Sequence, residues 1–317
     1  MDKSNGSVHV VFGSGPLGLS VVRELVRQGK PVRVVNGRSR PELPPGVELL
    51  SGDAYDTSFA RQAAQDAAVV YQCAQPGYTQ WPVKFPPLQA SILEAAAAAG
   101  AKLIVGENLY MYGDVDGLIH EDLPYAPNTR KGMVRAAMAE AALAAHRQGK
   151  VRVSLARGSD FFGPQVLGSA MGDRVFIPAL RGKAASLGGQ LDVPHTYTYI
   201  EDFGRAMVVL GERDEALGQA WHVPNDQPAI TQRQFVERIF QMVGGPSKMS
   251  AMGRTMMAIG GLFIPEARES VEMLYEFEKP FVVDSSRFER TFGRKATPLS
   301  ESIPATVGWY RRHLGLD

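Results

Sequence analysis

The chain has 317 residues, 44% of them hydrophobic, which is enough for one large α/β domain or for one domain with a smaller lobe. Because 34 Lys and Arg residues nearly balance 33 Asp and Glu residues, the net charge of +1 gives no reason to expect a nucleic-acid or anionic-membrane partner. The single cysteine fits a reducing cytoplasm, no apolar stretch is long enough to span a membrane, and the six histidines lack metal-ligand spacing, so we expect a cytoplasmic protein without a metal.

Residues 8–18 predict a strand, a tight turn and the start of a helix. The β-branched run 8–12 is followed by glycines with the spacing G-x-G-x-x-G. In such a turn the first glycine makes the bend, the second lets a pyrophosphate approach the backbone, and the third lets helix and strand pack closely. Free N–H groups at the helix start also attract phosphate. We therefore predict a dinucleotide site that is formed by Gly13, Ser14, Gly15, Pro16, Leu17 and Gly18.

The end of the second predicted strand, 32–35, bears on the choice between NAD and NADP. An NAD-specific site usually places an acidic side chain there, against the ribose hydroxyls. This chain has Asn36, followed by Arg38 and Ser39. A carboxylate would repel a ribose 2′-phosphate, whereas neutral Asn36 with Arg38 behind it would attract one. We predict that these three residues contact NADP(H), with NAD as the second choice. The alternative is that the arginines of this loop are only solvated.

Strand-like and helix-like segments alternate through the first half of the chain. Strands are predicted at 47–50, 68–73, 102–105 and 151–155, and helices at 56–65, 88–99 and 129–148. This alternation indicates an α/β protein of the Rossmann type, with a doubly wound parallel sheet covered on both faces. Ligands of such sheets bind beyond the carboxyl ends of the strands, where Asp53, Ala74, Asn108 and Arg157 lie.

Past residue 164 the pattern loosens into glycine-rich and methionine-rich stretches. Helices are predicted near 231–242 and 270–278, whereas 197–210 and 221–223 return to the main sheet. We expect a two-part organisation in which the second part is a smaller, C-terminal, substrate-binding lobe. The coenzyme-binding domain is predicted to comprise residues 1–164 and 190–224, and the lobe residues 165–189 and 225–317.

Several short segments follow the glycine turn in a characteristic order: Gly52-Asp53-Ala54, Met111-Tyr112-Gly113, Arg157 to Pro164, Tyr199 to Gly204, and Val282 to Ser286. Together they resemble the short-chain dehydrogenase/reductase superfamily, in the extended or atypical branch often labelled NAD-dependent epimerase/dehydratase, over nearly the whole chain. The resemblance implies a nicotinamide coenzyme. Its contacts in this chain are then expected to include Asp53 and Ala54 near the adenine, Cys73, Ala74 and Gln75 near the ribose, and Arg157.

The chain departs from this family at the acid/base pair, which is a Tyr followed four residues later by a Lys. Here Lys131 stands in place of the Tyr, Arg135 in place of the Lys, and Asn108 in place of a Ser or Thr. A Lys-x-x-x-Arg pair resembles the isoflavone-reductase-like branch, in which a lysine on this helix is the general acid or base. We therefore predict Lys131 as the group that moves the proton, and as a coenzyme contact, with Tyr110 as the second acid candidate and Asn108 positioning the substrate oxygen. The alternative is that Lys131 only binds phosphate or ribose, or lies on the surface.

Aromatic and polar residues near the strand ends predict the substrate contacts. Tyr78, Trp81 and Phe85 are separated by prolines, which favours an aromatic loop against a flat or apolar substrate; the alternative is a loop that folds on itself. His195, Tyr197 and Tyr199 alternate as in a strand, so they would share one face, either edging the pocket or packing the lobes. The predicted substrate contacts are Gln75, Tyr78, Trp81, Tyr110, Phe161, His195 and Tyr197.

Three functions remain open. The first is an NADP(H)-dependent oxidoreductase that acts on an apolar carbonyl, enone or alcohol. The second is a nucleotide-sugar epimerase or dehydratase, against which we weigh the missing Tyr/Lys pair and the few cations of the predicted lobe. The third is a catalytically silent NADP-binding sensor. The sequence also leaves a homodimer open.

Overall fold

The structure, a computed structural model, describes residues 8–37, 41–260 and 265–316. The chain divides into two compact units, which we describe separately. The first unit holds the described residues up to 111, then 131–157 and 203–221. The second holds 112–130, 158–202 and the described residues from 222 onward.

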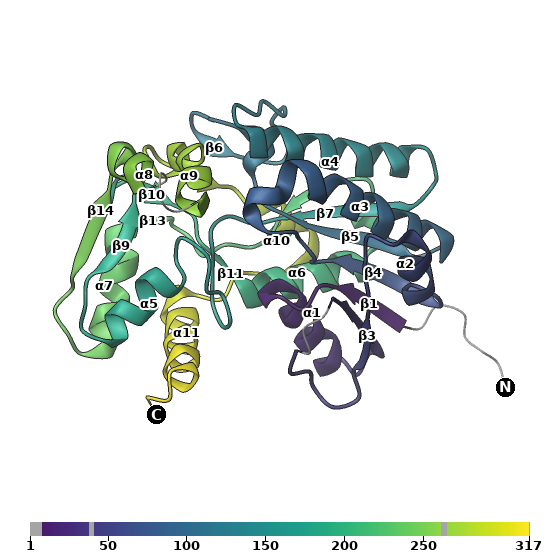
Figure 1. The fold of residues 1–317 in the computed structure, drawn as a ribbon, viewed down its shortest axis with the longest axis horizontal. Coiled ribbons are helices and arrows are strands. Elements are labelled where there is room, and N and C mark those ends of the chain that lie inside the picture. The colour runs from purple at the N-terminus through teal and green to yellow at the C-terminus, as the bar shows by residue number, and fades with distance from the viewer. Residues whose placement is uncertain (1–7, 38–40, 261–264, 317) are drawn as a thin grey trace. The chain divides into compact units, whose positions relative to one another are not determined.

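The first unit is built on a seven-stranded sheet with the strand order β12-β7-β5-β4-β1-β2-β3 (Figure 1). Its strands are β1 (Val8–Phe12), β2 (Val32–Asn36), β3 (Glu48–Ser51), β4 (Ala67–Gln72), β5 (Lys102–Glu107), β7 (Arg152–Arg157) and β12 (Ala220–His222). All pairings from β3 across to β7 are parallel. Val10, Val11 and Phe12 are fully buried, as expected for a strand covered on both faces. The predicted doubly wound sheet is confirmed.

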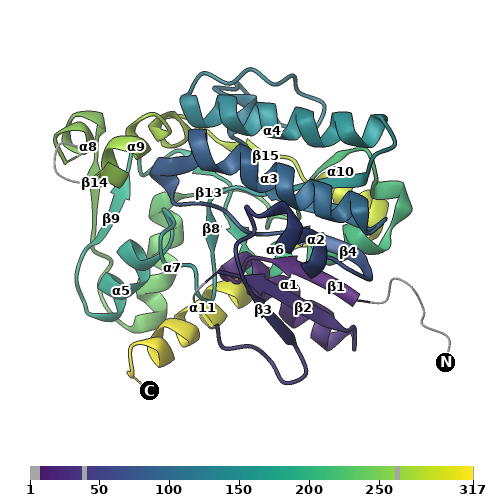
Figure 2. The same ribbon diagram turned by 45° about the vertical axis from the view of Figure 1, so that its right-hand side comes forward.

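Helices cover both faces of this sheet. They are α1 (Pro16–Arg27), α2 (Thr57–Ala63), α3 (Trp81–Ala98), α4 (Arg130–Arg147) and α6 (Ile200–Glu212). In Figures 1 and 2, α3 and α4 lie on one face and α1 on the other. Helix α6 packs on α1 so closely that a Cβ on Gly204 would lie 2.1 Å from the hydroxyl of Ser20. Short 3₁₀ turns, η1 (Tyr78–Gln80), η2 (Tyr110–Tyr112) and η3 (Asp214–Ala216), complete the connections.

Helix α3 begins seven residues earlier than the sequence predicts. The prediction of an aromatic loop is wrong, because Trp81 and Phe85 lie in the first turns of this helix and are only 5% and 3% exposed. A proline in the first turn costs little, since the N–H it lacks has no partner there. Pro86 and Pro87 lie further in and do remove backbone hydrogen bonds. Burial of the two aromatic rings outweighs that loss.

The second unit has its own hydrophobic core. It lies among α5 (Asp173–Leu180), α7 (Gln232–Val243), α11 (Leu299–His313) and the parallel pair β9 (Ala185–Gly188) and β14 (Met249–Met252). Thr231 and Gln234 form a capping box at the start of α7, so this predicted helix is confirmed. The predicted helix 270–278 is wrong, because α9 (Pro265–Val271) ends and a 3₁₀ turn, η4 (Leu274–Phe277), follows.

Short elements complete the second unit. They are β6 (Leu118–Ile119), β8 (Phe161–Phe162), β10 (Pro194–His195), β11 (Thr198–Tyr199), β13 (Ile230–Thr231), β15 (Val282–Val283), α8 (Arg254–Gly260) and α10 (Ser286–Phe292). Parallel pairing joins β11 to β8 and β15 to β6, and antiparallel pairing joins β10 to β13. Over the described part of the chain, no helix combines the length and the apolar character needed to cross a bilayer.

Candidate active site

The glycine turn between β1 and α1 leaves room for a phosphate. Gly13 has φ +99°, and a Cβ there would lie 2.6 Å from the backbone nitrogen of Ala74. A Cβ on Gly18 would lie 2.0 Å from the carbonyl oxygen of Gly13, so this position requires glycine. A Cβ on Gly15 would meet no atom within 4 Å. Because Gly15 is the N-cap of α1 and no side chain caps the helix, the open space faces the positive end of its dipole. This cradle fits a dinucleotide pyrophosphate.

The predicted ribose and adenine contacts lie at the ends of β2 and β3. The carbonyl of Asn36 accepts a hydrogen bond from the backbone of Gly52 at 2.9 Å, which joins the two strand ends. Asp53 is exposed, and its carboxylate accepts a hydrogen bond from the backbone of Tyr55 at 3.0 Å. Ala54 is half-buried beside it. The predicted contacts Arg38 and Ser39 lie outside the described residues.

The segment after β4 passes close to the glycine turn. The backbone nitrogen of Cys73 donates to the carbonyl of Phe12 at 2.9 Å, and Ala74 is the residue that crowds Gly13. Burial raises the pKa of the Cys73 thiol, so this group stays protonated and is a poor nucleophile. Gln75 is exposed. These placements suit backbone contacts to a ligand rather than thiol chemistry.

Two buried cations lie one turn apart on α4 and are covered by aromatic rings. Lys131 is fully buried, and its Nζ lies 4.4 Å from the ring centroid of Tyr78. The guanidinium of Arg135, which is 1% exposed, lies 4.7 Å from the ring centroid of Phe85 and 5.9 Å from that of Trp81. Aromatic faces stabilise cations at such distances. Three residues that were expected to face a substrate therefore cover positive charges of α4.

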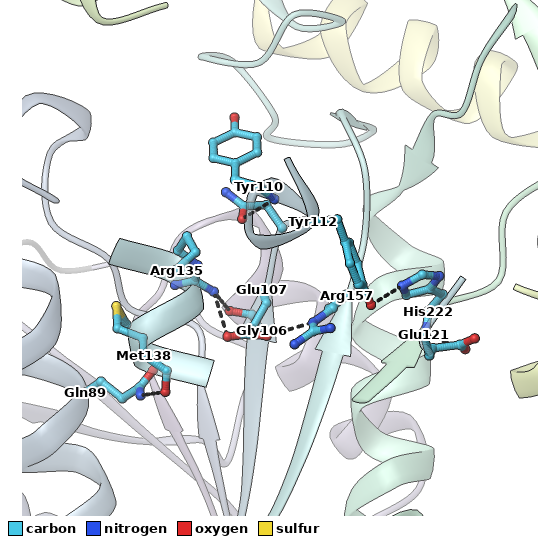
Figure 3. Close-up of polar contacts among 11 residues, drawn as sticks. Gln89, Gly106, Glu107, Tyr110, Tyr112, Glu121, Arg135, Met138, Arg157 and His222 are labelled. Carbon is cyan, nitrogen blue, oxygen red and sulfur yellow. Dashed lines mark hydrogen bonds and ion pairs between the residues drawn. The ribbon is translucent and has the colours of Figure 1, made fainter. Parts of the chain in front are cut away.

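Sequence reasoning missed Glu107, which lies at the carboxyl end of β5. Its carboxylate accepts a hydrogen bond from Nε of Arg157 at 3.0 Å and lies 3.4 Å from the guanidinium of Arg135. Figure 3 shows the two arginines on opposite sides of this carboxylate. Burial lowers the pKa of Arg135. The negative charge of Glu107 opposes this shift, and the positive charge of Arg157 adds to it. Arg157, predicted as a coenzyme contact, is therefore held in a buried charge cluster. The sequence did hold a signal for Glu107, because an acidic residue at the carboxyl end of a strand lies where such sheets bind ligands.

The two remaining catalytic candidates follow β5 directly. The side-chain oxygen of Asn108 accepts a hydrogen bond from the backbone of Tyr110 at 3.3 Å, which shapes the short turn η2. Tyr110 is half-buried, with its ring centroid 6.0 Å from that of Trp81. The structure thus brings Tyr78, Trp81, Tyr110 and Lys131 into one cluster of the first unit.

The other predicted substrate contacts belong to the second unit. Phe161 is half-buried in β8, whereas His195 and Tyr197 are 1% and 5% exposed. Nε2 of His195 lies 2.6 Å from a carboxylate oxygen of Asp160. Tyr112 also lies in this unit, where its hydroxyl is 2.9 Å from Nε2 of buried His222 (Figure 3). Among the residues described, no cluster of three or more His, Cys, Asp or Glu side chains has the arrangement of a metal site.

Comparisons with known proteins bear on the family and the fold of this chain. Residues 9–223 match the model of the "NAD dependent epimerase/dehydratase family". A dTDP-glucose 4,6-dehydratase of Streptomyces griseus is 24% identical over 228 residues. That match covers 70% of this chain but only 63% of the relative, so the chain spans less than two thirds of this curated protein.

Solved structures share the fold. A UDP-glucose 4-epimerase of Thermotoga maritima with UDP-glucose is 16% identical, with a TM-score of 0.78 and coverage of 97% of this chain and 99% of that one. A dTDP-glucose 4,6-dehydratase of Streptomyces venezuelae with bound NAD is 18% identical, with a TM-score of 0.80 and coverage of 97% and 98%. At these identities the likeness concerns the fold alone.

Proposed function

This chain belongs to the NAD-dependent epimerase/dehydratase family, a family of NAD-dependent enzymes, and from that premise we propose that it catalyses hydride transfer at a sugar carbon of a nucleotide sugar, with Lys131 moving the proton. The position of Lys131 carries the proposal. A lysine buried at the start of α4, behind the ring of Tyr78, is an ionisable group of the kind that acid/base catalysis needs.

The choice of substrate class rests on the named relatives. A dehydratase that acts on dTDP-glucose and an epimerase solved with UDP-glucose support a nucleotide sugar. The first expectation, an apolar carbonyl, drew on an aromatic loop that is in fact a helix, and Trp81 and Phe85 pack against Arg135 instead. The nucleotide sugar, which the sequence left as an alternative, is therefore the better-supported substrate.

We further propose that the coenzyme is NADP(H). Solved structures of the same fold contain NAD, so they support a nicotinamide dinucleotide as the coenzyme but do not bear on the 2′-phosphate that distinguishes NADP. The argument for the phosphate is the neutral Asn36 at the end of β2, where a carboxylate would repel it, together with Arg38 two residues later.

Residues of the first unit have separate roles in the proposed reaction. When bound, the coenzyme supplies a nicotinamide that accepts and returns a hydride. The glycine turn at the start of α1 holds the pyrophosphate. Lys131 exchanges a proton with the substrate oxygen at the reacting carbon, Asn108 donates a hydrogen bond to that oxygen, and Tyr78 shields the lysine from water.

The test compares Lys131→Met with Lys84→Met, which removes an exposed lysine of α3. Each protein is incubated with NADP or NAD and either dTDP-glucose or UDP-glucose, and products are followed by NMR. Lys131→Met should keep coenzyme affinity within a few-fold and lose at least about 100-fold in turnover, whereas Lys84→Met should resemble the wild type. Equal turnover in the two variants would exclude Lys131 from the chemistry. Coenzyme binding without turnover of either sugar would favour the sensor instead.

A further inference from the structure

The last residue of β2 is an asparagine that is followed by glycine. Asn36 is half-buried, and its backbone carbonyl accepts the hydrogen bond from Gly52 that joins β2 to the segment after β3. Gly37 is exposed and lies just outside the strand. Its N–H donates no hydrogen bond to a backbone carbonyl of the described residues. The peptide nitrogen that follows Asn36 is therefore not held by the sheet.

An asparagine beside such a nitrogen can lose its side-chain amide. The nitrogen of the next residue bonds to Cγ and closes a cyclic imide, and the side-chain nitrogen leaves as ammonia, which takes the proton of the attacking N–H. Water then adds to either ring carbonyl, the ring C–N bond breaks, and a proton returns to the backbone nitrogen. In total, an amide and a water become a carboxylate and an ammonium ion. Glycine favours the attack because no Cβ shields its nitrogen.

We propose that Asn36 is a modification site, at which loss of ammonia creates a carboxylate and shifts coenzyme preference from NADP to NAD. Opening of the imide at either carbonyl gives aspartate or isoaspartate, so both products carry the negative charge. A carboxylate at the end of β2 repels a ribose 2′-phosphate and accepts hydrogen bonds from ribose hydroxyls. The inference rests on the proposed function, because it needs the coenzyme to approach this strand end.

The hydrogen bond between Asn36 and Gly52 opposes the modification. Closing the imide requires rotation about the Cα–C bond of Asn36, which turns its carbonyl away from the Gly52 nitrogen, now 2.9 Å away. The end of β2 must therefore open locally before the ring can form. A coenzyme that contacts the closed strand end stabilises it against opening, so bound NADP should slow the loss of ammonia.

Peptide mapping by mass spectrometry tests the modification itself. Purified protein is kept at mildly alkaline pH, and loss of the amide is followed at each asparagine. Asn36 should react at least about tenfold faster than Asn108, a half-buried asparagine at the end of β5 that is followed by the buried Leu109. Gly37→Ala should slow the loss at Asn36, and alanine fits there, because a Cβ would meet no described atom within 4 Å. Equal rates at Asn36 and Asn108 would overturn the proposal.

Calorimetry on the aged protein then tests the consequence. The ratio of the NADP and NAD dissociation constants should move toward that of Asn36→Asp as the modification proceeds, whereas aged Gly37→Ala should keep the ratio it had when fresh. If Asn36→Asp changes the ratio but the modified wild type does not, this inference is overturned and the proposed function stands. If neither changes it, the NADP preference in the proposed function is wrong. Failure of the fresh wild type to bind either coenzyme would overturn both.

Discussion

Glu107 and Arg157 form an ion pair in which neither side chain has any exposed surface, with Nε of the arginine 3.0 Å from the carboxylate. The two residues are also register partners on the neighbouring strands β5 and β7. Because the ends of these strands are where a parallel sheet binds ligands, the pair fixes backbone geometry next to the candidate site. The guanidinium of Arg135, from α4, adds a third buried charge.

Glu107→Gln should destabilise the protein by about 3–5 kcal/mol, because it leaves buried guanidinium charge without its carboxylate. Urea unfolding measures the change. The matched control is Glu48→Gln, which breaks the half-exposed ion pair with Arg33 and should cost at most about 1 kcal/mol. Equal costs for the two variants would show that the buried cluster does not hold the strand ends together.

Gly15→Ala and Gly18→Ala should separate coenzyme binding from folding. A Cβ on Gly15 meets nothing within 4 Å, so this variant should keep the melting temperature of the wild type but bind NADP at least about tenfold more weakly. A Cβ on Gly18 meets the Gly13 carbonyl at 2.0 Å, so that variant should lower the melting temperature as well. Thermal unfolding and calorimetry give both quantities. Unchanged coenzyme affinity in Gly15→Ala would contradict a phosphate at this turn.

Asn36→Asp should shift coenzyme preference toward NAD. A carboxylate at the end of β2 would repel the 2′-phosphate of NADP and accept hydrogen bonds from the ribose hydroxyls of NAD. We expect the ratio of the two dissociation constants to change by about tenfold or more, with Arg38→Ala weakening NADP in the same direction. If both variants affect NAD and NADP equally, the proposed preference for NADP is wrong.

Glu276→Gln should change how stability depends on pH. Burial, and then the charge of Asp160, raise the pKa of Glu276 well above 4.5, so the folded protein holds its proton where the unfolded chain has lost it. Stability from this group is therefore complete below about pH 4.5 and is lost as pH rises through the folded-state pKa. Glutamine cannot ionise, so the variant should gain stability over the wild type as pH rises. Melting temperatures from pH 4.5 to 8 test this, with exposed Glu42→Gln as the control.

Local sequence patterns predicted the strands and helices of the first unit, but they did not predict its buried charge cluster. The β-branched runs and the glycine spacing were sufficient for β1, α1 and the parallel sheet, because period and turn chemistry are local properties. The start of α3 was missed because its prolines are local signals, whereas the burial of Trp81 and Phe85 depends on tertiary packing.

The pairs that the sequence could not reveal are distant along the chain. Glu107 and Arg157 are 50 residues apart, and Asp160 and His195 are 35 residues apart. No periodicity links such positions, so only the fold brings them together. The roles predicted for Lys131, Tyr110 and Asn108 stay predictions until the variants are measured.

The order of the sheet has one last consequence. β1 and β4 are neighbours, but the chain leaves β1 into α1 and β4 into α3, on opposite faces (Figure 2). Two connections that diverge in this way mark the place at the carboxyl ends of the strands where sheets of this kind bind their ligands. Because the strand order sets this place, the side chains around it can differ between proteins that share the fold. The UDP-glucose 4-epimerase and dTDP-glucose 4,6-dehydratase structures that share this fold are only 16% and 18% identical to this chain, so the backbone arrangement tolerates extensive change of the amino acids.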